Sequence, residues 1–270
     1  MELSYAKSIP MGGFSFENYL RNETLKDKVG MKPKMTSTGT TIVGCIFNGG
    51  VALAADTRAT MGPIVGDKNC FKLHYLAPNI YTCGAGTAAD CDHVTEMIKR
   101  DLDLHRLNTG CQSRIATAVT KFSSHLFKYM GHIGCALIIG GIDVKGPQLC
   151  SVDPHGHTQY NPYLTTGSGS LAAMSIMETE YKDDMTEEEA TKLVVKCVEA
   201  GIYHDLGSGS NVDVAIIKMD GVNVTRSYKH DNFKLYSRPG GYSFPAGTTE
   251  VIEEFRHKLI VTEGDAPMEL

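Results

Sequence analysis

A glycine followed by two threonines is the part of this sequence that most directly predicts covalent chemistry. Gly39, Thr40 and Thr41 stand where a charged, aperiodic segment meets the first β-rich run. If the bond between Gly39 and Thr40 is cut, Thr40 gains a free α-amine beside its own hydroxyl. An unperturbed α-amine has a pKa of about 7.7 to 8.0, so it can accept the hydroxyl proton near neutral pH. The pattern predicts a threonine nucleophile released by cleavage, although the start of an ordinary strand also fits it.

A carboxylate and an amine follow this threonine within two short stretches. Asp56 ends the second β-rich run, and Lys72 closes the sequence Asp67-Lys68-Asn69-Cys70-Phe71-Lys72. A buried ammonium near a threonine hydroxyl would favour the alkoxide, and a paired carboxylate would hold that ammonium in place. An ion pair on the protein surface is the alternative interpretation of these two residues.

Three glycine-containing turns stand at predicted junctions between strands and helices. They cover residues 83–90, 167–170 and 205–213. A helix N-terminus exposes unpaired N–H groups, and Gly86 in the first turn could offer its N–H to a developing oxyanion. A phosphate-binding loop is the rival interpretation, but the first two turns match neither GxGxxG nor GxxxxGK[ST].

Hydrophobic periodicity indicates the elements that must position these residues. Apolar runs and the hairpin signal Asn48-Gly49-Gly50 predict strands at residues 41–47, 51–55, 71–75, 80–83, 135–142, 148–152 and 212–218. Two helix pairs are predicted between them, with Thr186 as the cap of the last helix. Their expected apolar faces include Leu104, Leu107, Phe127 and Leu171. Runs of strands followed by runs of helices favour an α+β fold, with two antiparallel sheets faced by helix pairs.

The two ends of the chain differ from residues 40–225 in composition and in hydrophobic periodicity. Residues 1–39 carry six basic and four acidic side chains, a net charge of +2, and show no sustained period, so we expect an extended segment there. Residues 226–270 contain Pro239-Gly240-Gly241 and Pro245. They are expected to form an arm that packs on a neighbour, or a tail without regular structure.

Composition excludes several classes of function. The 270 residues include 26 basic and 31 acidic side chains, and a net charge of −5 argues against general binding to nucleic acid or an anionic membrane. No apolar run approaches the roughly 18 residues of a membrane span, and no secretory signal is expected. Eight scattered cysteines form no CxxC pair, and His155 and His157 have no further ligands in sight, so neither a metal nor another cofactor is expected. Reduced thiols fit a cytosolic or nuclear compartment.

Taken together and in order, these motifs resemble those of the catalytic beta subunits of the eukaryotic proteasome core particle. The resemblance covers nearly all of residues 40–225 and is to the trypsin-like second beta subunit in precursor form. It is carried by Thr40-Thr41-Ile42-Val43-Gly44, Ala54-Ala55-Asp56-Thr57-Arg58-Ala59-Thr60, Asp67-Lys68-Asn69-Cys70, Cys83-Gly84-Ala85-Gly86-Thr87-Ala88-Ala89-Asp90, Gly167-Ser168-Gly169-Ser170-Leu171-Ala172-Ala173 and Asp205-Leu206-Gly207-Ser208-Gly209-Ser210-Asn211. Gly12-Gly13-Phe14-Ser15-Phe16-Glu17-Asn18 resembles the pro-segment of that subtype.

The resemblance implies a role for each matching residue. Thr40 would be the nucleophile, freed by autolysis at the Gly39-Thr40 bond, and Asp56 and Lys72 would set the electrostatics of the site. Gly86 would serve the oxyanion hole. A hydrogen-bond network around the terminal amine would be formed by Ser168, Asp205 and Ser208. A pocket beside Thr40, with Asp92 as the carboxylate for a basic substrate side chain, would be formed by Ala59, Thr60, Cys70, His74, Gly84, Ala88 and Asp92.

The same resemblance implies a four-layer αββα sandwich, the fold of N-terminal-nucleophile hydrolases. It divides the chain into a pro-segment (1–39), a catalytic domain (40–225) and a C-terminal arm on a neighbouring subunit (226–270). The implied activity is a threonine endopeptidase that cleaves unfolded polypeptides after basic residues in the cytoplasm and nucleus. The implied partners are other beta and alpha subunits, in a particle of four stacked seven-membered rings (28 subunits), together with regulatory caps.

Three alternatives from other classes remain. A non-catalytic ring subunit is disfavoured by the complete Thr, Asp and Lys set. A hydrolase of the same type acting on a small amide would not be expected to carry the long arm after residue 225. A nucleotide-binding module is disfavoured because the sequence has no phosphate-loop lysine.

Overall fold

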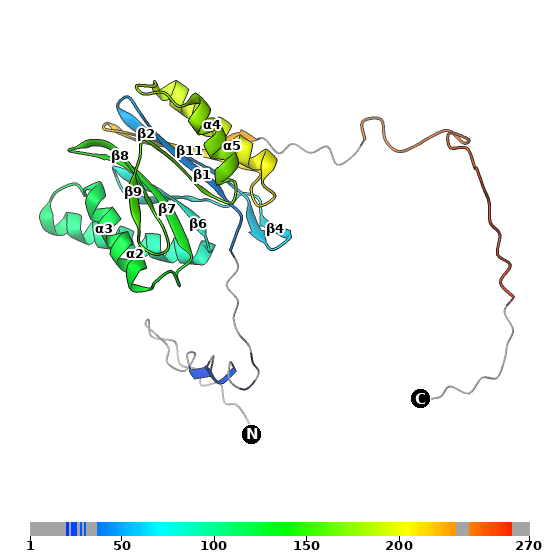
Figure 1. Ribbon diagram of the computed structural model, residues 1–270, viewed down its shortest axis with the longest axis horizontal. Coiled ribbons are helices and arrows are strands. Elements are labelled where there is room, and N and C mark those ends of the chain that lie inside the picture. The colour runs from blue at the N-terminus through cyan, green and yellow to red at the C-terminus, as the bar shows by residue number, and fades with distance from the viewer. Residues whose placement is uncertain are drawn as a thin grey trace. The chain divides into compact units, whose positions relative to one another are not determined.

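Two five-stranded antiparallel sheets form the centre of the folded part of the chain (Figure 1). The computed structural model describes residues 20–21, 23–25, 28, 30, 37–230 and 238–260. The first sheet has the order β10-β1-β2-β11-β12, with β10 at Tyr163–Gly167, β1 at Thr41–Phe47, β2 at Gly50–Asp56, β11 at Asn211–Lys218 and β12 at Gly221–His230. The second has the order β5-β6-β7-β8-β9, with β5 at Leu73–Ala77, β6 at Ile80–Gly86, β7 at Cys135–Asp143, β8 at Gly146–Val152 and β9 at Thr158–Tyr160.

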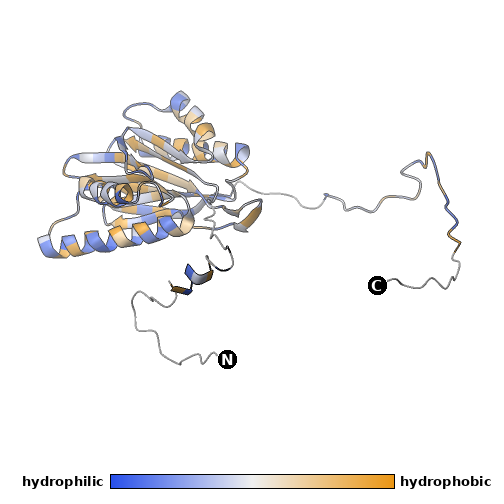
Figure 2. Cartoon of the chain, turned by 60° about the horizontal axis from the view of Figure 1, so that its bottom comes forward, coloured by the Kyte–Doolittle hydropathy of each residue, from blue (hydrophilic) through white to orange (hydrophobic). Residues whose placement is uncertain are grey.

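A pair of helices covers the outer face of each sheet (Figure 1). Helices α4 (Ser170–Glu180) and α5 (Glu187–His204) pack on the first sheet, and α2 (Ala88–Thr109) and α3 (Ile115–Lys128) pack on the second. A third apolar cluster lies between the two sheets. Figure 2 shows mainly hydrophobic sheets, whereas the helices carry many hydrophilic residues. The arrangement confirms the expected α+β fold with four αββα layers.

Strand β1 shows why the sheets stack in this way. Its residues alternate between clusters: Ile42 belongs to the one between the sheets and Val43 to the one under α4 and α5. Both faces of the strand are therefore buried, which explains its nearly continuous apolar sequence. A Cβ atom on Gly44 would lie 2.8 Å from Leu53 Cδ2 and 2.9 Å from Leu149 Cδ1, so the two sheets approach closely at this point.

Several elements were absent from the sequence prediction. The short hairpin of β3 (Ala59–Met61) and β4 (Ile64–Asp67) leaves Met61 and Ile64 exposed, so its pattern does not mark a core strand. Strands β9, β10 and β12 were also missed because their residues are largely half-buried or exposed. Strand β12 runs through His230, past the domain boundary expected at residue 225.

The expected apolar faces of the helices were wrong at four positions. Leu104, Leu107, Phe127 and Leu171 are 66%, 77%, 68% and 84% exposed. In α2 the buried residues include Val94, Ile98 and Leu102, which follow a four-residue spacing, and Leu104 and Leu107 lie off that stripe. Hydrophobicity alone therefore did not identify the buried face.

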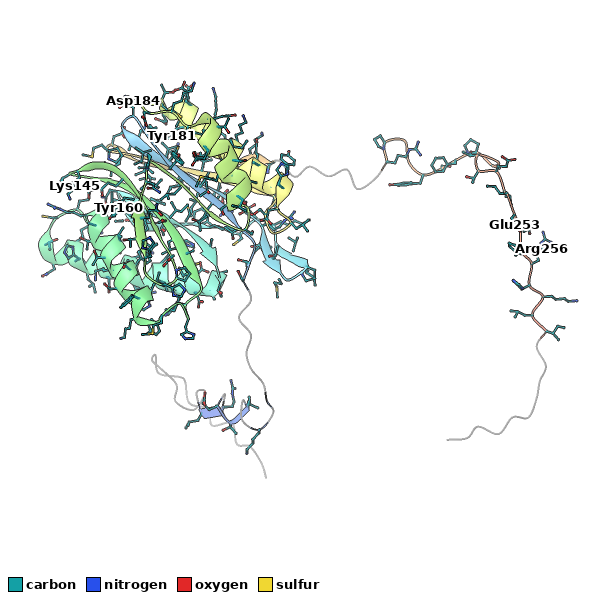
Figure 3. The ribbon with its side chains drawn as sticks, in the orientation of Figure 1. Lys145, Tyr160, Tyr181, Asp184, Glu253 and Arg256 are labelled. Atoms are coloured by element: carbon teal, nitrogen blue, oxygen red, sulfur yellow. The ribbon has the colours of Figure 1, made fainter. Side chains whose placement is uncertain are left out.

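The chain divides into Met1–Asn232 and Phe233–Leu270. Most of the expected pro-segment, including residues 12–18, lies outside the described residues. In the second unit, residues 238–260 contain no helix or strand, and Figure 3 marks the side chains of Glu253 and Arg256 there. No helix in the described part of the chain combines the length and apolar character that a membrane span requires.

The side chain of Asn79 connects the loop before α3 to the second sheet. It lies in the turn between β5 and β6, is buried, and donates its side-chain amide to Ser113 O at 3.0 Å and Ile142 O at 2.7 Å. We expect Asn79→Ala to lower the free energy of unfolding by about 2 kcal/mol, because two buried carbonyls lose their donor. Urea unfolding of the folded chain measures this. Asn79→Asp should destabilise further, since a carboxylate would face two carbonyl oxygens, and a loss below about 0.5 kcal/mol for either variant would contradict the role.

Candidate active site

Thr40 immediately precedes β1, and glycines closely approach the polypeptide around it. The Thr40 side chain is buried, and Thr41 pairs with Gly167 of β10. Gly167 has φ +103°, and a Cβ atom there would lie 2.1 Å from Thr40 O. Gly169 N donates to the same carbonyl oxygen at 3.3 Å. Only glycine fits position 167, because both its backbone conformation and the space around it exclude a side chain.

A buried ion pair stands next to the Thr40 hydroxyl. Lys72 Nζ lies 2.8 Å from Asp56 Oδ1, with both side chains almost fully buried. The same ammonium donates hydrogen bonds to Thr40 Oγ1 and to Gly39 O, both at 3.1 Å. The structure therefore brings together the three residues whose types first indicated nucleophilic chemistry, and a surface ion pair is excluded as the interpretation of Asp56 and Lys72.

The Asp56 carboxylate is held by backbone donors as well as by lysine. Thr41 N donates to Oδ1 at 2.9 Å, and Gly209 N and Arg58 N donate to Oδ2 at 3.1 and 3.2 Å. Burial raises the pKa of Asp56, while the Lys72 ammonium and these N–H groups oppose that rise. Since each oxygen is satisfied, the carboxylate can remain charged in the core and keep Lys72 in place.

A second network surrounds the nitrogen of Thr40. Thr40 N donates to Ser168 Oγ at 3.0 Å, and Ser168 Oγ donates to Asp205 Oδ2 at 2.5 Å. Ser208 Oγ donates to the same oxygen at 2.7 Å, and Gly207 N donates to Oδ1 at 3.0 Å. Burial raises the pKa of Asp205, but these hydroxyl and N–H donors outweigh it and leave the pKa below its usual value. The three residues expected in a network at the Thr40 nitrogen, Ser168, Asp205 and Ser208, are therefore brought together there.

Thr38 and Gly39, which directly precede Thr40, bind to the backbone and side chains around the site. Thr38 forms an antiparallel bridge with Gly86, with Thr38 N donating to Gly86 O at 3.0 Å. Gly39 N donates to Thr60 Oγ1 at 2.9 Å. A Cβ atom on Gly39 would lie 2.2 Å from the Cα atom of Gly207, so position 39 must be glycine. A peptide thus occupies the cleft by strand addition, with the Gly39-Thr40 bond beside Lys72.

The carbonyl oxygen of Gly39 accepts two hydrogen bonds. Thr40 Oγ1 donates to it at 2.6 Å and Lys72 Nζ at 3.1 Å, so positive charge already lies where an oxyanion would develop. Gly86 takes part in the site through its carbonyl, and a Cβ atom there would lie 2.4 Å from Gly134 O. The expected donation by its N–H to an oxyanion stays a prediction.

A small cavity beside Thr40 contains most of the expected pocket residues. Its lining includes Cys70, His74, Gly84, Ala88 and Asp92, as predicted, together with Thr38, Thr40, Phe71, Lys72, Gly86 and Cys91. Ala59 and Thr60 do not line it among the described residues; Thr60 instead binds Gly39 N. Cys91 was missed, although its place three residues after Ala88 puts both on one face of α2.

Two titratable side chains face each other in this cavity, which Lys72 also lines. His74 Nδ1 lies 3.8 Å from Asp92 Oδ1, and the Asp92 side chain is 70% exposed. Burial lowers the pKa of His74, and the nearby Asp92 opposes that change. The lowered pKa favours the neutral imidazole of His74, which would not compete with a basic substrate side chain for Asp92.

A metal centre finds no support in the described part of the chain. No group of three or more His, Cys, Asp or Glu residues there could hold a metal ion. All eight cysteines are free thiols.

Comparison with known proteins agrees with this geometry. Residues 36–217 match the family model described as "Proteasome subunit". Proteasome subunit beta type-7 of Dictyostelium discoideum is 53% identical over 249 residues, covering 92% of this chain and 93% of its own. Proteasome subunit beta type-7-A of Arabidopsis thaliana is 49% identical, covering 96% of both chains, and beta type-2 of Saccharomyces cerevisiae is 49% identical, covering 90% and 94%. The chain therefore belongs to the proteasome subunit family, among its beta subunits.

Proposed function

We propose that this chain is a self-processing threonine endopeptidase subunit of the proteasome core particle. The observation that carries the proposal is the position of Lys72 Nζ, 3.1 Å from both Thr40 Oγ1 and Gly39 O, with Asp56 as its counter-ion. One cation thus contacts both the nucleophile and the carbonyl that it would attack. A structural ring subunit has no need of such a buried charge pair beside an enclosed hydroxyl.

Processing begins with attack on the Gly39-Thr40 bond. Thr40 Oγ adds to the Gly39 carbonyl carbon, and the oxyanion is stabilised by Lys72. The hydroxyl proton passes to the Thr40 nitrogen as the C–N bond breaks, which leaves an ester between Gly39 and Thr40 Oγ. Water hydrolyses this ester, giving a Gly39 carboxylate and a Thr40 with free amine and free hydroxyl.

Cleavage of other polypeptides repeats the reaction with the released amine as the base. In the precursor the Thr40 nitrogen is an amide and cannot accept a proton, so the unprocessed chain is a zymogen. After release, the α-amine of Thr40 takes the proton of Thr40 Oγ, and this oxygen attacks the substrate carbonyl. The α-amine then gives the proton to the leaving amine of the substrate. The substrate strand takes the place of residues 38 and 39 in the cleft.

Thr40 is required for its own release. In particles whose other subunits are proteolytically inactive, we expect Thr40→Ala to retain residues 1–39, because it has no hydroxyl to attack Gly39. Intact-mass measurement reports this directly. Thr40→Ser keeps a hydroxyl and should lose the segment, and a Thr40→Ala chain that still matured there would show that another agent cuts the bond.

The compact charge of Lys72 is a second requirement. We expect Lys72→Ala to lower peptide turnover roughly 10²-fold or more, since the cation beside the nucleophile and oxyanion is lost. Lys72→Arg should fail as well, because a planar guanidinium does not fit the space of an ammonium between Asp56 and Thr40. Turnover of a fluorogenic tripeptide checks both variants. Lys68→Arg, an exposed change in the same loop, is the control, and near-normal turnover of Lys72→Arg would contradict the electrostatic account.

The cavity supports cleavage after basic residues. Gly84 contributes no side chain, and a Cβ atom there would lie 3.0 Å from Cys91 Cβ, so a larger residue would fill the space. A Lys or Arg side chain entering beside Gly84 meets Asp92, whereas an apolar side chain leaves that carboxylate unpaired.

Asp92 is the carboxylate to test. We expect Asp92→Asn to lower the ratio of turnover after Arg to turnover after Leu roughly three- to ten-fold, a modest effect because the side chain is largely exposed. A panel of matched peptide substrates measures the ratio. Glu96→Gln removes a charge one helical turn away without touching the cavity lining and should leave the ratio unchanged. An unchanged ratio in Asp92→Asn would assign the specificity to charges outside this chain.

Assembly and location complete the proposal. The chain would join other beta and alpha subunits in stacked seven-membered rings, with regulatory caps controlling access to the enclosed sites. Its arm would pack on a neighbouring subunit, which is supported by the exposed apolar side chains of Val251, Ile252, Phe255 and Leu259. Eight free thiols are compatible with the cytoplasm and nucleus.

A further inference from the structure

The Thr41 hydroxyl sits in a tightly fitted, fully buried space behind the nucleophile. Cβ atoms on Gly169 and Gly201 would lie 2.0 and 2.2 Å from Thr41 Oγ1. Gly169 caps α4 and Gly201 belongs to the last turn of α5, so two helices close on one hydroxyl. Their backbones approach this closely only because neither position carries a side chain. The Thr41 side chain therefore has a single orientation.

The hydrogen bond between the Thr41 and Ser208 hydroxyls has a direction that follows from the hydrogens available. Thr41 Oγ1 and Ser208 Oγ are 2.6 Å apart. Ser208 has one hydroxyl hydrogen and donates it to Asp205 Oδ2 at 2.7 Å. The carboxylate of Asp205 has no hydrogen to offer in return. The hydrogen between Thr41 and Ser208 therefore belongs to Thr41, and Ser208 is held as an acceptor on one side and a donor on the other.

The nitrogen of Thr40 reaches the same carboxylate oxygen from the other side. Thr40 N donates to Ser168 Oγ, and Ser168 donates to Asp205 Oδ2. Ser168 Oγ also lies 3.3 Å from Thr40 O, a longer contact that competes for its single hydrogen. Two limbs of hydrogen bonds, starting at the consecutive residues Thr40 and Thr41, thus meet at Asp205 Oδ2.

We propose that Thr41 is a positioning residue, whose hydroxyl fixes the direction of the hydrogen-bond network that orients the Thr40 nitrogen. This inference rests on the proposed function. With both limbs directed toward Asp205, Ser168 presents a lone pair to that nitrogen. The released amine then donates one N–H to Ser168 and keeps its own lone pair for the proton of Thr40 Oγ.

Loss of the Thr41 hydroxyl would remove this order. Ser208 would become a buried hydroxyl without its donor and would be able to turn away from Asp205. Asp205 would then hold Ser168 less firmly, and the hydrogen of Ser168 could turn to Thr40 O or to the amine. An amine that accepts from Ser168 has no lone pair left for the catalytic proton, so the proton-transfer step slows while substrate binding is unaffected.

The test is the pair Thr41→Val and Thr41→Ser in purified core particles. Valine keeps the shape without the hydroxyl, whereas serine keeps the hydroxyl without the methyl group. Intact-mass measurement gives the fraction of chains that are mature. If self-processing is slow, the variants are made with a leader that a separate protease removes, so that mature chains are still obtained. We expect Thr41→Val to lower kcat per mature chain roughly ten-fold, about 1.4 kcal/mol, with KM changed less than about two-fold. Thr41→Ser should recover most of that loss.

A buried threonine outside the site separates positioning from packing. Thr82 of β6 is fully buried and donates to Ile138 O at 3.0 Å, so Thr82→Val removes a comparable hydrogen bond. We expect a similar loss of thermal stability from Thr82→Val but no loss of kcat. The proposal is overturned if Thr41→Val keeps full kcat, if Thr41→Ser loses as much as Thr41→Val, or if Thr82→Val lowers kcat equally. An inactive or unprocessed wild-type chain would instead contradict the proposed function.

Discussion

The buried ion pair between Asp56 and Lys72 is the constraint around which the site is built. Two opposite charges removed from water are tolerable only when they are close together and their remaining polar atoms are bonded. Here the Asp56 carboxylate accepts hydrogen bonds from the backbone N–H groups of residues 41, 58 and 209. The Lys72 ammonium donates its other hydrogen bonds to Thr40 and Gly39. The Lys72 charge is thereby directed at the Gly39-Thr40 bond, which has the Thr40 hydroxyl beside it.

Glycine makes the close approach of these segments possible. Residues 39 to 41 are enclosed by backbone from the β10–α4 turn, the last turn of α5 and the loop before β11. Cβ atoms on Gly167, Gly169, Gly201 and Gly207 would each lie within 2.8 Å of residues 39, 40 or 41. Thr40 is therefore surrounded mostly by peptide groups, whose positions are set by the sheets and helices. This close packing places residues that are far apart in sequence within about 3 Å of each other.

The two-sheet architecture also explains how a peptide can enter such a closed site. Gly86 lies at the end of β6 in one sheet, and Thr40 immediately precedes β1 in the other. The edge between them accepts Thr38 as a short antiparallel partner. Under the proposed function, a substrate strand added at this edge would place its carbonyl at Lys72 and a side chain at the cavity lined by Cys70, His74 and Asp92. Reaction and specificity would then follow from one mode of binding.

The sequence by itself determined much of the fold and the chemical inventory. Buried strands such as β1, β2 and β11 have nearly continuous apolar runs, and Thr186 with Glu189 forms a capping box that depends only on local spacing. Thr40, Asp56 and Lys72 could be named because their residue types and motifs are specific. Tertiary structure decided the rest: the place of Cys91 in the cavity, the absence of Ala59 and Thr60 from its lining, and the contact of Thr41 with Ser208. That contact joins residues 167 positions apart, and the bond from Thr40 N to Ser168 joins residues 128 apart. Local patterns carry no information about such pairs, because their distances and hydrogen-bond directions depend on how whole layers pack.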